Sequence, residues 1–114
     1  MKDNNPLIQV SMQIILYAGD ARNDADTALN AAENGNFKEA VHYLKDAEKN
    51  ITLAHQAQTD IVQAEMAGTN YEPCLLFSHA QDTLMTITSE IKFTKRLITL
   101  YRRLDQESLE KGVL

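Results

Sequence analysis

The sequence of 114 residues is poor in the two residues that most often interrupt regular structure, with four glycines and two prolines. An average domain of this length has about 13 to 14 of the two combined. All-β folds need turn residues about every 8 to 12 positions, and disordered linkers are rich in Gly, Pro or Ser. Most all-β folds and a Gly-, Pro- or Ser-rich disordered chain are therefore excluded. We predict a single domain over residues 1–114 that is built from a few long helices.

Other scarcities narrow the class of protein further. Cys74 is the one cysteine, so the sequence has no internal disulfide and no CxxC motif. The net charge of −5 argues against a nucleic-acid partner, which needs Lys and Arg to neutralise its phosphates. No apolar run approaches the roughly 20 residues of a membrane span, and Lys2 followed by Asp3 does not begin a signal peptide. We expect a cytoplasmic protein without direct membrane insertion.

The few prolines and glycines mark where helices begin and end. Pro6 follows Asn5, which suits an N-cap residue followed by proline in the first turn. Gly35 lies between two asparagines, so it can end one helix while Asn36 caps the next. Gly68 and Pro73 bound the only real loop. These signals predict helices over about residues 5–34, 37–67 and 74–110.

Each predicted helix has an apolar stripe with alternating steps of three and four residues, which is typical of helices packed at a shallow angle. The predicted fold class is therefore all-α, with three long antiparallel helices in an elongated up-down-up bundle. The stripes consist of Ile14, Ala18, Ala21, Ala25, Ala28 and Ala32; of Phe37, Ala40, Leu44, Ala47, Ile51, Ala54, Gln58 and Ile61; and of Leu76, Ala80, Leu84, Ile87, Ile91, Thr94, Ile98 and Tyr101.

Two features do not follow from the bundle alone. Gly19 lies inside the first helix, where glycine costs about 1 kcal/mol relative to alanine. A close helix contact is the favoured explanation, and a local kink is the alternative. Basic residues also cluster late in the third helix, where a solvated face near a helix C-terminus is favoured over a docking surface. This basic cluster consists of Lys92, Lys95, Arg96, Arg102 and Arg103.

The third helix has a polar flank that becomes apolar. At about 100° per residue, the flank carries His79, Asp82, Thr83, Thr86 and Glu90, and further along it carries Phe93, Leu97, Leu100, Tyr101 and Leu104. Three helices give each helix only two neighbours, so the extra apolar flank suggests self-association. The polar residues would then lie in or beside that interface.

The spacing alone leaves the role of the polar residues open between a structural patch and a functional histidine. A neutral imidazole at His79 can act as a nucleophile, a base or a metal ligand. A serine hydrolase is excluded because the chain has no nucleophile elbow. A zinc site is weakly supported, since His42, His55 and His79 show no spacing such as HExxH.

A longer match extends this argument. Residues 79–86, His-Ala-Gln-Asp-Thr-Leu-Met-Thr, resemble the HAQDHLMT signature of the lactose/cellobiose-type IIA proteins of the bacterial phosphoenolpyruvate-dependent sugar phosphotransferase system (PTS). Three further stretches fit the same family: residues 18–22 (AGDAR), residues 35–40 (Gly-Asn-Phe followed by Ala40) and residues 54–59 (AHQAQT). Together they cover about residues 7–104 in the order of the family.

The resemblance implies a three-helix subunit that forms a homotrimer, a nine-helix bundle. It implies a phosphotransferase component that is not a stand-alone enzyme. His79 would accept a phosphoryl group from the phosphocarrier HPr as tele-phosphohistidine and pass it to a cysteine of the cognate IIB component. The group would finally reach a β-linked disaccharide during transport by IIC. Asp82 would help to hold one divalent cation per trimer, which we expect to be Mg²⁺.

The supporting residues are Gln81, Thr83 and Thr86, of which Gln81 and Thr86 can hydrogen-bond locally. Thr83 departs from the family, which usually has a second histidine there. A threonine cannot carry positive charge, so the departure bears on the stability of the phosphorylated state and leaves the acceptor role of His79 intact. The residues do not identify the transported sugar. A non-catalytic helical adaptor and a metal-binding oligomer without phosphoryl chemistry are the alternative functions.

The remaining candidates are interpreted as structural. We expect His55 to be a hydrogen-bonded structural histidine, although a second active residue is the alternative, and His42 to be a surface residue. Cys74 is expected to be a small, partly buried group, because the transfer cysteine of the family belongs to the partner. Met12, Met66 and Met85 are expected to fill the core or an interface.

Overall fold

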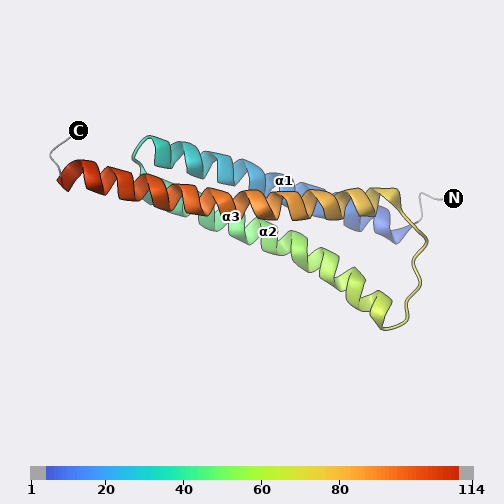
Figure 1. The fold of residues 1–114 in the computed structure, drawn as a ribbon. Coiled ribbons are helices and arrows are strands. Elements are labelled where there is room, and N and C mark those ends of the chain that lie inside the picture. Colours follow the sequence, from blue (N-terminus) through green and yellow to red (C-terminus); the bar gives the residue numbers. More distant parts are fainter. Residues whose placement is uncertain (1–4, 111–114) are drawn as a thin grey trace.

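The protein is a bundle of three helices in up-down-up order, shown by a computed structural model that describes residues 5–110 (Figure 1). The helices are α1 (Pro6–Glu33), α2 (Phe37–Met66) and α3 (Leu75–Glu110). No strand occurs within the described range. The predicted all-α class with antiparallel neighbours is confirmed, and each helix begins and ends within one residue of its predicted bounds.

The start of α1 is fixed by Asn5. Its side-chain oxygen accepts a hydrogen bond from the backbone N–H of Leu7 at 3.0 Å, and Pro6 occupies the first turn. The Asn5 amide also donates to the backbone carbonyl of Glu72 at 3.1 Å. This second bond ties the beginning of α1 to the loop that leads into α3.

Glycine ends both of the first two helices with the same backbone motif. Gly35 and Gly68 have φ values of 79° and 107°, in the left-handed region that favours glycine. The N–H of Asn36 bonds to the carbonyl of Ala31 at 2.8 Å, and that of Thr69 bonds to the carbonyl of Ala64 at 3.0 Å. These are the long-range bonds of a Schellman motif, so each glycine satisfies carbonyls at a helix end.

The prediction that the Asn36 side chain caps α2 is wrong. Asn36 does stand at the N-cap position, but its side chain makes no capping hydrogen bond, and its backbone has φ −90° and ψ 70°. A capping side chain normally needs an extended backbone. Asn36 is held away from that conformation because its own N–H closes the C-terminal motif of α1.

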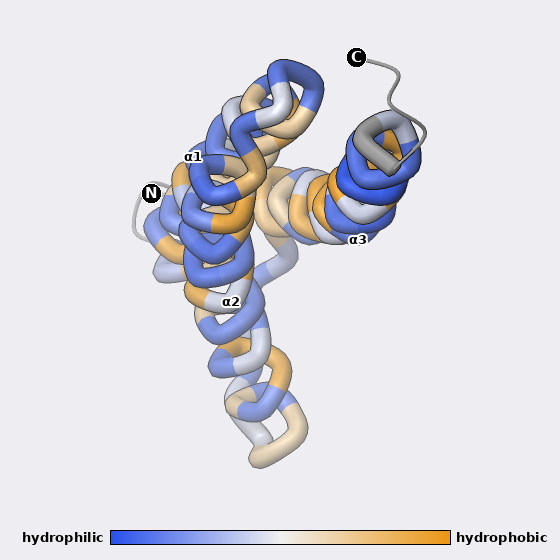
Figure 2. Tube along the Cα trace, turned by 90° about the vertical axis from the view of Figure 1, so that its left-hand side faces the viewer, coloured by the Kyte–Doolittle hydropathy of each residue, from blue (hydrophilic) through white to orange (hydrophobic). Residues whose placement is uncertain are grey.

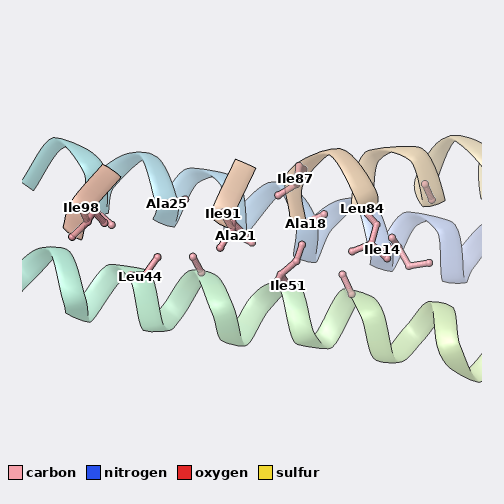
Figure 3. Packing of buried hydrophobic residues seen from close by; sticks show 14 of the residues in the cluster. Ile14, Ala18, Ala21, Ala25, Leu44, Ile51, Leu84, Ile87, Ile91 and Ile98 are labelled. Atoms are coloured by element: carbon pink, nitrogen blue, oxygen red, sulfur yellow. The ribbon is translucent and has the colours of Figure 1, made fainter. Parts of the chain in front are cut away.

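The core lies along the three facing stripes, and Figure 3 shows isoleucines and leucines of α2 and α3 meeting alanines of α1. Almost all of the predicted stripe positions are buried, including Thr94. The alanines let the backbones approach closely, which leaves little room for large side chains between α1 and its neighbours. Tyr101 was predicted to be in the core but is 36% exposed, and Phe37, Gln58 and Leu76 are only half-buried.

The bundle is elongated, with extents of 66 × 23 × 18 Å. Its radius of gyration of 18.4 Å exceeds the roughly 13 Å of a compact chain of this length. The C-terminal end of α2 diverges from the other two helices in both views (Figures 1 and 2). Val62 and Met66 near that end are accordingly 38% and 83% exposed. A single copy therefore leaves much of its long surface without a packing partner.

Two sequence expectations about packing are corrected within the described chain. No atom lies within 4 Å of the position that a Cβ on Gly19 would take, so the expected close helix contact is absent from this copy. The three methionines are not core residues either, because Met12, Met66 and Met85 are between 55% and 83% exposed. Their alternative role at an interface remains a prediction.

None of the helices in the described range combines the length and the apolar character that a membrane crossing requires.

Candidate functional site

The candidate site is the polar first half of the outer face of α3. At about 100° per residue, His79, Asp82 and Thr86 lie on the side of α3 opposite to the buried Leu84. All three are exposed, while Gln81 and Thr83 on the flanks are half-buried. The core side of the same turns is fixed, since Ala80 and Leu84 are fully buried. The helix therefore presents these polar groups from a rigid support.

The imidazole of His79 is open to an incoming molecule. Across residues 5–110, neither of its ring nitrogens has a hydrogen-bond or ion-pair partner in the same chain, although Asp82 lies three residues further along the helix. Because the described chain engages neither nitrogen, both remain available to a partner. The ring can act as a nucleophile through its unprotonated nitrogen.

Thr83 is attached to the backbone of His79. Its hydroxyl donates to the His79 carbonyl at 2.9 Å, a bond between residues one helical turn apart. A threonine hydroxyl has a single hydrogen, so in this arrangement its oxygen can still accept but cannot donate to a group on His79. Gln81 and Thr86 can hydrogen-bond locally, but neither side chain makes a hydrogen bond within the described range.

Glu90, at the end of the polar flank, forms a bidentate ion pair with Arg22 of α1. The Nε–Oε1 and Nη2–Oε2 distances are 2.8 and 2.9 Å. The hydrogen bonding to Glu90, with the negative charges of Glu90 and Asp26, raises the pKa of Arg22 above its ordinary value. Both side chains are nearly half exposed, so the pair should add little stability, but it shows which residues of α1 and α3 lie at the same height.

His55 links α2 to α3 at Thr88, two residues beyond Thr86 of the candidate site. Its Nε2 lies 3.0 Å from the hydroxyl oxygen of Thr88, and that hydroxyl donates to the carbonyl of Leu84 at 2.7 Å. Because the one hydroxyl hydrogen goes to Leu84, the hydrogen between His55 and Thr88 must come from His55 Nε2. His55 is half-buried and hydrogen-bonded, as expected for a structural histidine.

The two other candidates also lie where the sequence placed them. His42 is a surface residue, with its side chain 68% exposed and Nε2 3.6 Å from the carboxylate of Asp46. Cys74 is a free, half-buried thiol that packs beside the core just before α3 begins. Within residues 5–110, neither residue forms a hydrogen bond or an ion pair with the polar flank of α3.

Asp82 has a free carboxylate on the same outer face. It makes no hydrogen bond or ion pair with the rest of the described range. Nor do residues 5–110 contain three or more His, Cys, Asp or Glu side chains grouped so that they could hold a metal ion. A carboxylate oxygen is a ligand that Mg²⁺ prefers, but a single copy offers only one at this position.

The outer face of α3 becomes apolar beyond Glu90, as the sequence predicted. Phe93, Leu97, Leu100 and Leu104 are between 41% and 68% exposed. Monomeric proteins rarely expose a continuous apolar strip of this kind. The polar group around His79 and this strip follow one another along the same face of α3.

The basic cluster divides into two groups. Lys95 pairs with Glu48 of α2 at 3.7 Å, and the guanidinium of Arg102 lies 5.5 Å from the ring centroid of Phe37. Lys92, Arg96 and Arg103 have no such partner among the described residues. All five basic residues are exposed, as the favoured interpretation of a solvated face expects, and Lys95 and Arg102 also make contacts within the bundle.

Sequence reasoning missed the side-chain links between helices, such as Arg22–Glu90 and His55–Thr88. The four residues are of types that can form such bonds, and the sequence pattern had already placed Glu90 on the polar flank of α3. Arg22 and Glu90 are 68 residues apart, and His55 and Thr88 are 33 apart. The relative height of two helices cannot be read from their separate stripes, so the pairings required the register that the structure supplies.

Comparison with known proteins agrees with this fold and identifies the family. Residues 9–102 match the family described as "PTS system, Lactose/Cellobiose specific IIA subunit". The lichenan-specific phosphotransferase enzyme IIA component of Bacillus subtilis is 36% identical, over 91% of this chain and 94% of its own length. The lactose-specific EIIA component of Lacticaseibacillus casei is 34% identical, over 93% of this chain and 95% of its own length.

A solved structure gives the same result in three dimensions. The cellobiose-specific enzyme IIA of Bacillus anthracis superposes with a TM-score of 0.84 at 35% identity, covering 89% of this chain and 93% of that one. The fold and the matched residues define a helical-bundle subunit of the IIA class. The chain belongs to the lactose/cellobiose-specific IIA family of the PTS, as the stretch at residues 79–86 predicted.

Proposed function

We propose that this protein is a phosphocarrier of sugar uptake in the cytoplasm, with His79 as the phosphoryl acceptor. It takes the group from phospho-HPr and passes it to the cysteine of the cognate IIB component, which phosphorylates a β-linked disaccharide while IIC transports it. The observation that carries the proposal is the exposed His79 ring, which has no partner among residues 5–110 and stands on a helix anchored by Ala80 and Leu84. Membership of the IIA family supports it.

The proposed chemistry is a pair of phosphoryl transfers. In the first, the lone pair of neutral Nε2 of His79 attacks phosphorus in line, while the bond from phosphorus to the donor histidine of HPr breaks. In the second, the thiolate of IIB attacks the same phosphorus and the bond to Nε2 breaks. Such transfers depend mainly on positioning and on charge stabilisation. A carrier therefore needs an accessible nitrogen on a rigid support, which α3 provides.

Because His79 is exposed, its partners must protect the phosphoryl group from water. A phosphohistidine on an open surface is accessible to water, and hydrolysis would waste the group. Each partner therefore has to cover His79 during transfer. The hydroxyl of Thr83 supplies no positive charge and in this structure donates to a backbone carbonyl. The charge that stabilises the transferring group must then come from outside this residue, and the partner is the natural source.

The proposed assembly is a homotrimer around the outer face of α3. Seven of the twelve large hydrophobic residues that are exposed among the described side chains belong to α3. In a three-fold arrangement, the strip from Phe93 to Leu104 of each copy would meet the same strip of the other two, because the axis would run along α3. Burying these strips removes the apolar surface that one copy leaves in water. The polar residues around Asp82 would then face the same axis.

The proposed cation follows from that arrangement. Three copies of Asp82 would bring three carboxylates together beside an apolar interface, and like charges in such a place oppose assembly. A divalent cation such as Mg²⁺, one per trimer, would be held by these oxygens and would supply the compensating charge. The fit is sound on this chain's side, since the Asp82 carboxylate is exposed and engaged by no other described residue.

Reconstitution tests the function. The purified protein is incubated with phosphoenolpyruvate, enzyme I and HPr, and the phosphate on it is measured, with HPr omitted as the control. We expect a label that depends on HPr, is labile in acid and is stable in base. An adaptor or a metal-binding oligomer would take up no label, so its absence would overturn the proposal.

A further inference from the structure

The three unpaired cations of α3 form one stripe beside its apolar face. Lys92, Arg96 and Arg103 lie within about 40° of one another around the helix. All three are exposed, and none has an ion-pair partner among residues 5–110. Met85, seven residues before Lys92, continues the stripe and is 57% exposed. We call these four residues the basic stripe.

A surface of opposite charge runs along α1. Asp26 and Glu33 are exposed and form no ion pair in the described range, although the charge of Asp26 acts on Arg22 one turn away. Both lie within about 40° of Arg22 around α1, and Gly19 lies within about 60°. A Cβ on Gly19 would meet open space on this side. We call Gly19, Asp26 and Glu33 the α1 edge.

The Arg22–Glu90 pair places the two surfaces at matching heights. The helices α1 and α3 run in the same direction (Figure 1), and the pair aligns residue n of α1 with residue n + 68 of α3. Asp26 is then level with Thr94, between Lys92 and Arg96. Glu33 is level with Tyr101, two residues before Arg103, and Gly19 is level with Ile87, two residues after Met85. Gly19, Asp26 and Glu33 of the α1 edge therefore each lie at about the height of a residue of the basic stripe.

The two surfaces cannot meet within one copy. Glu90 marks the flank of α3 that faces α1, and the cations of the basic stripe lie about 120° to 160° away around the helix. A second copy removes this obstacle. Rotation about an axis parallel to α3 leaves every residue at its own height. It brings the basic stripe of one copy beside the flank of the next copy on which its α1 packs.

We infer that the α1 edge is the docking surface for the basic stripe of a second copy of this chain. This inference rests on the trimer of the proposed function and identifies its outer contacts. Lys92 and Arg96 meet the partner copy at Asp26, Arg103 meets it at Glu33, and Met85 packs over Gly19. The contact is head-to-tail, because each copy gives its stripe to one neighbour and its edge to the other. It also explains why a helix that needs no glycine for its own packing contains one.

Charge exchange tests the polar contacts. Arg103→Glu and Glu33→Arg should each weaken trimer association at least tenfold in sedimentation at low salt, and the double variant should return to within about threefold of the wild type. Arg96→Glu with Asp26→Lys forms a second, independent cycle. Lys45→Glu on α2 makes the same change of charge at an exposed position outside both surfaces, and should have little effect. Single variants that assemble normally would overturn the inference.

Gly19 tests the steric part. Gly19→Leu should raise the helix content or thermal stability of a single copy, because leucine favours helix and nothing lies within 4 Å to clash with it. The same variant should lose the trimer, because the added side chain fills the space that Met85 occupies. Gln13→Leu adds an exposed leucine on another side of α1 and should leave assembly intact. A Gly19→Leu trimer as stable as the wild type would contradict the inference.

The outcomes separate this inference from the function on which it rests. If the wild type sediments as a monomer at micromolar concentration, the trimer and the docking surface both fail, while phosphoryl acceptance by His79 can still be measured. If the wild type is a trimer and both charge cycles and Gly19→Leu leave it unchanged, the docking surface alone is wrong.

Discussion

The guanidinium of Arg22 and the carboxylate of Glu90 form a two-bond ion pair, with N–O distances of 2.8 and 2.9 Å. The pair joins α1 to α3 across 68 residues of sequence and aligns their heights. It lies where the polar flank of α3 gives way to the apolar strip that begins at Phe93. The pair therefore marks the register of α1 against α3, although the contact itself is exposed.

We expect this pair to contribute modestly to stability. In a double-mutant cycle of Arg22→Ala and Glu90→Ala, the coupling should be up to about 1 kcal/mol at low salt and should fall as salt is added, because both side chains are nearly half exposed. The measurement is urea denaturation at one fixed protein concentration. The single, longer contact of Lys95 with Glu48 gives the comparison, and its coupling should be smaller. A salt-independent coupling would contradict this account.

We expect the hydrogen bond between His55 and Thr88 to contribute measurably to stability. Thr88→Val keeps the shape and the β-branched character of the side chain but removes the oxygen that accepts from His55 Nε2. We expect a loss of about 1 kcal/mol, since a half-buried donor is left without a partner. The matched control is Thr52→Val, because the Thr52 hydroxyl bonds only to the carbonyl of Glu48 on its own exposed helix face. Equal losses for the two variants would show that the cross-helix bond adds nothing.

Thr83 should be dispensable for phosphoryl acceptance. Its hydroxyl hydrogen is directed at the backbone carbonyl of His79, so it is not offered to a group on the imidazole. Thr83→Ala should therefore be labelled by phospho-HPr at a rate within about threefold of the wild type. Its stability should not fall, because alanine is the better helix former. A tenfold slower rate with a folded trimer would assign Thr83 a direct part in the transfer.

A variant of Asp82 should show whether the cation causes trimer assembly or only stabilises the trimer. In the proposed trimer, Asp82→Leu removes three like charges from beside an apolar strip, so the trimer should persist without bound Mg²⁺ and be insensitive to chelation. The wild-type trimer should weaken when the metal is removed. Calorimetry with Mg²⁺ and sedimentation with and without EDTA measure the two effects. Loss of the Asp82→Leu trimer would show that the cation is the cause of assembly and not its stabiliser.

The sequence predicted the fold because local signals and packing agreed. Pro6, Gly35 and Gly68 each act within a few residues, through a restricted backbone or a positive φ, so their effects on helix ends can be inferred without knowing the rest of the chain. The three stripes then required one arrangement. The error at Asn36 arose because one residue was eligible for two motifs, and its N–H was already used by the end of α1.

The candidate site was predictable only in part. His79, Asp82 and Thr86 share the outer face of one helix, and their common exposure follows from helical spacing alone. Contacts between helices did not follow, as Arg22–Glu90 and His55–Thr88 show, because they depend on register. The close contact expected at Gly19 is absent from one copy, where a Cβ would meet open space, and the methionines that were expected in the core or an interface are exposed. A surface that a second copy covers has no contact signal in one copy.

The central claim is that His79 carries the phosphoryl group, and labelling of matched histidine variants tests it most directly. His79→Ala, His42→Ala and His55→Ala are each incubated with phosphoenolpyruvate, enzyme I and HPr, and circular dichroism confirms that each is folded. His42 is an exposed histidine outside the site, and His55 is hydrogen-bonded to α3. The account predicts that only His79→Ala loses the acid-labile phosphate. Undiminished labelling of a folded His79→Ala protein would contradict it.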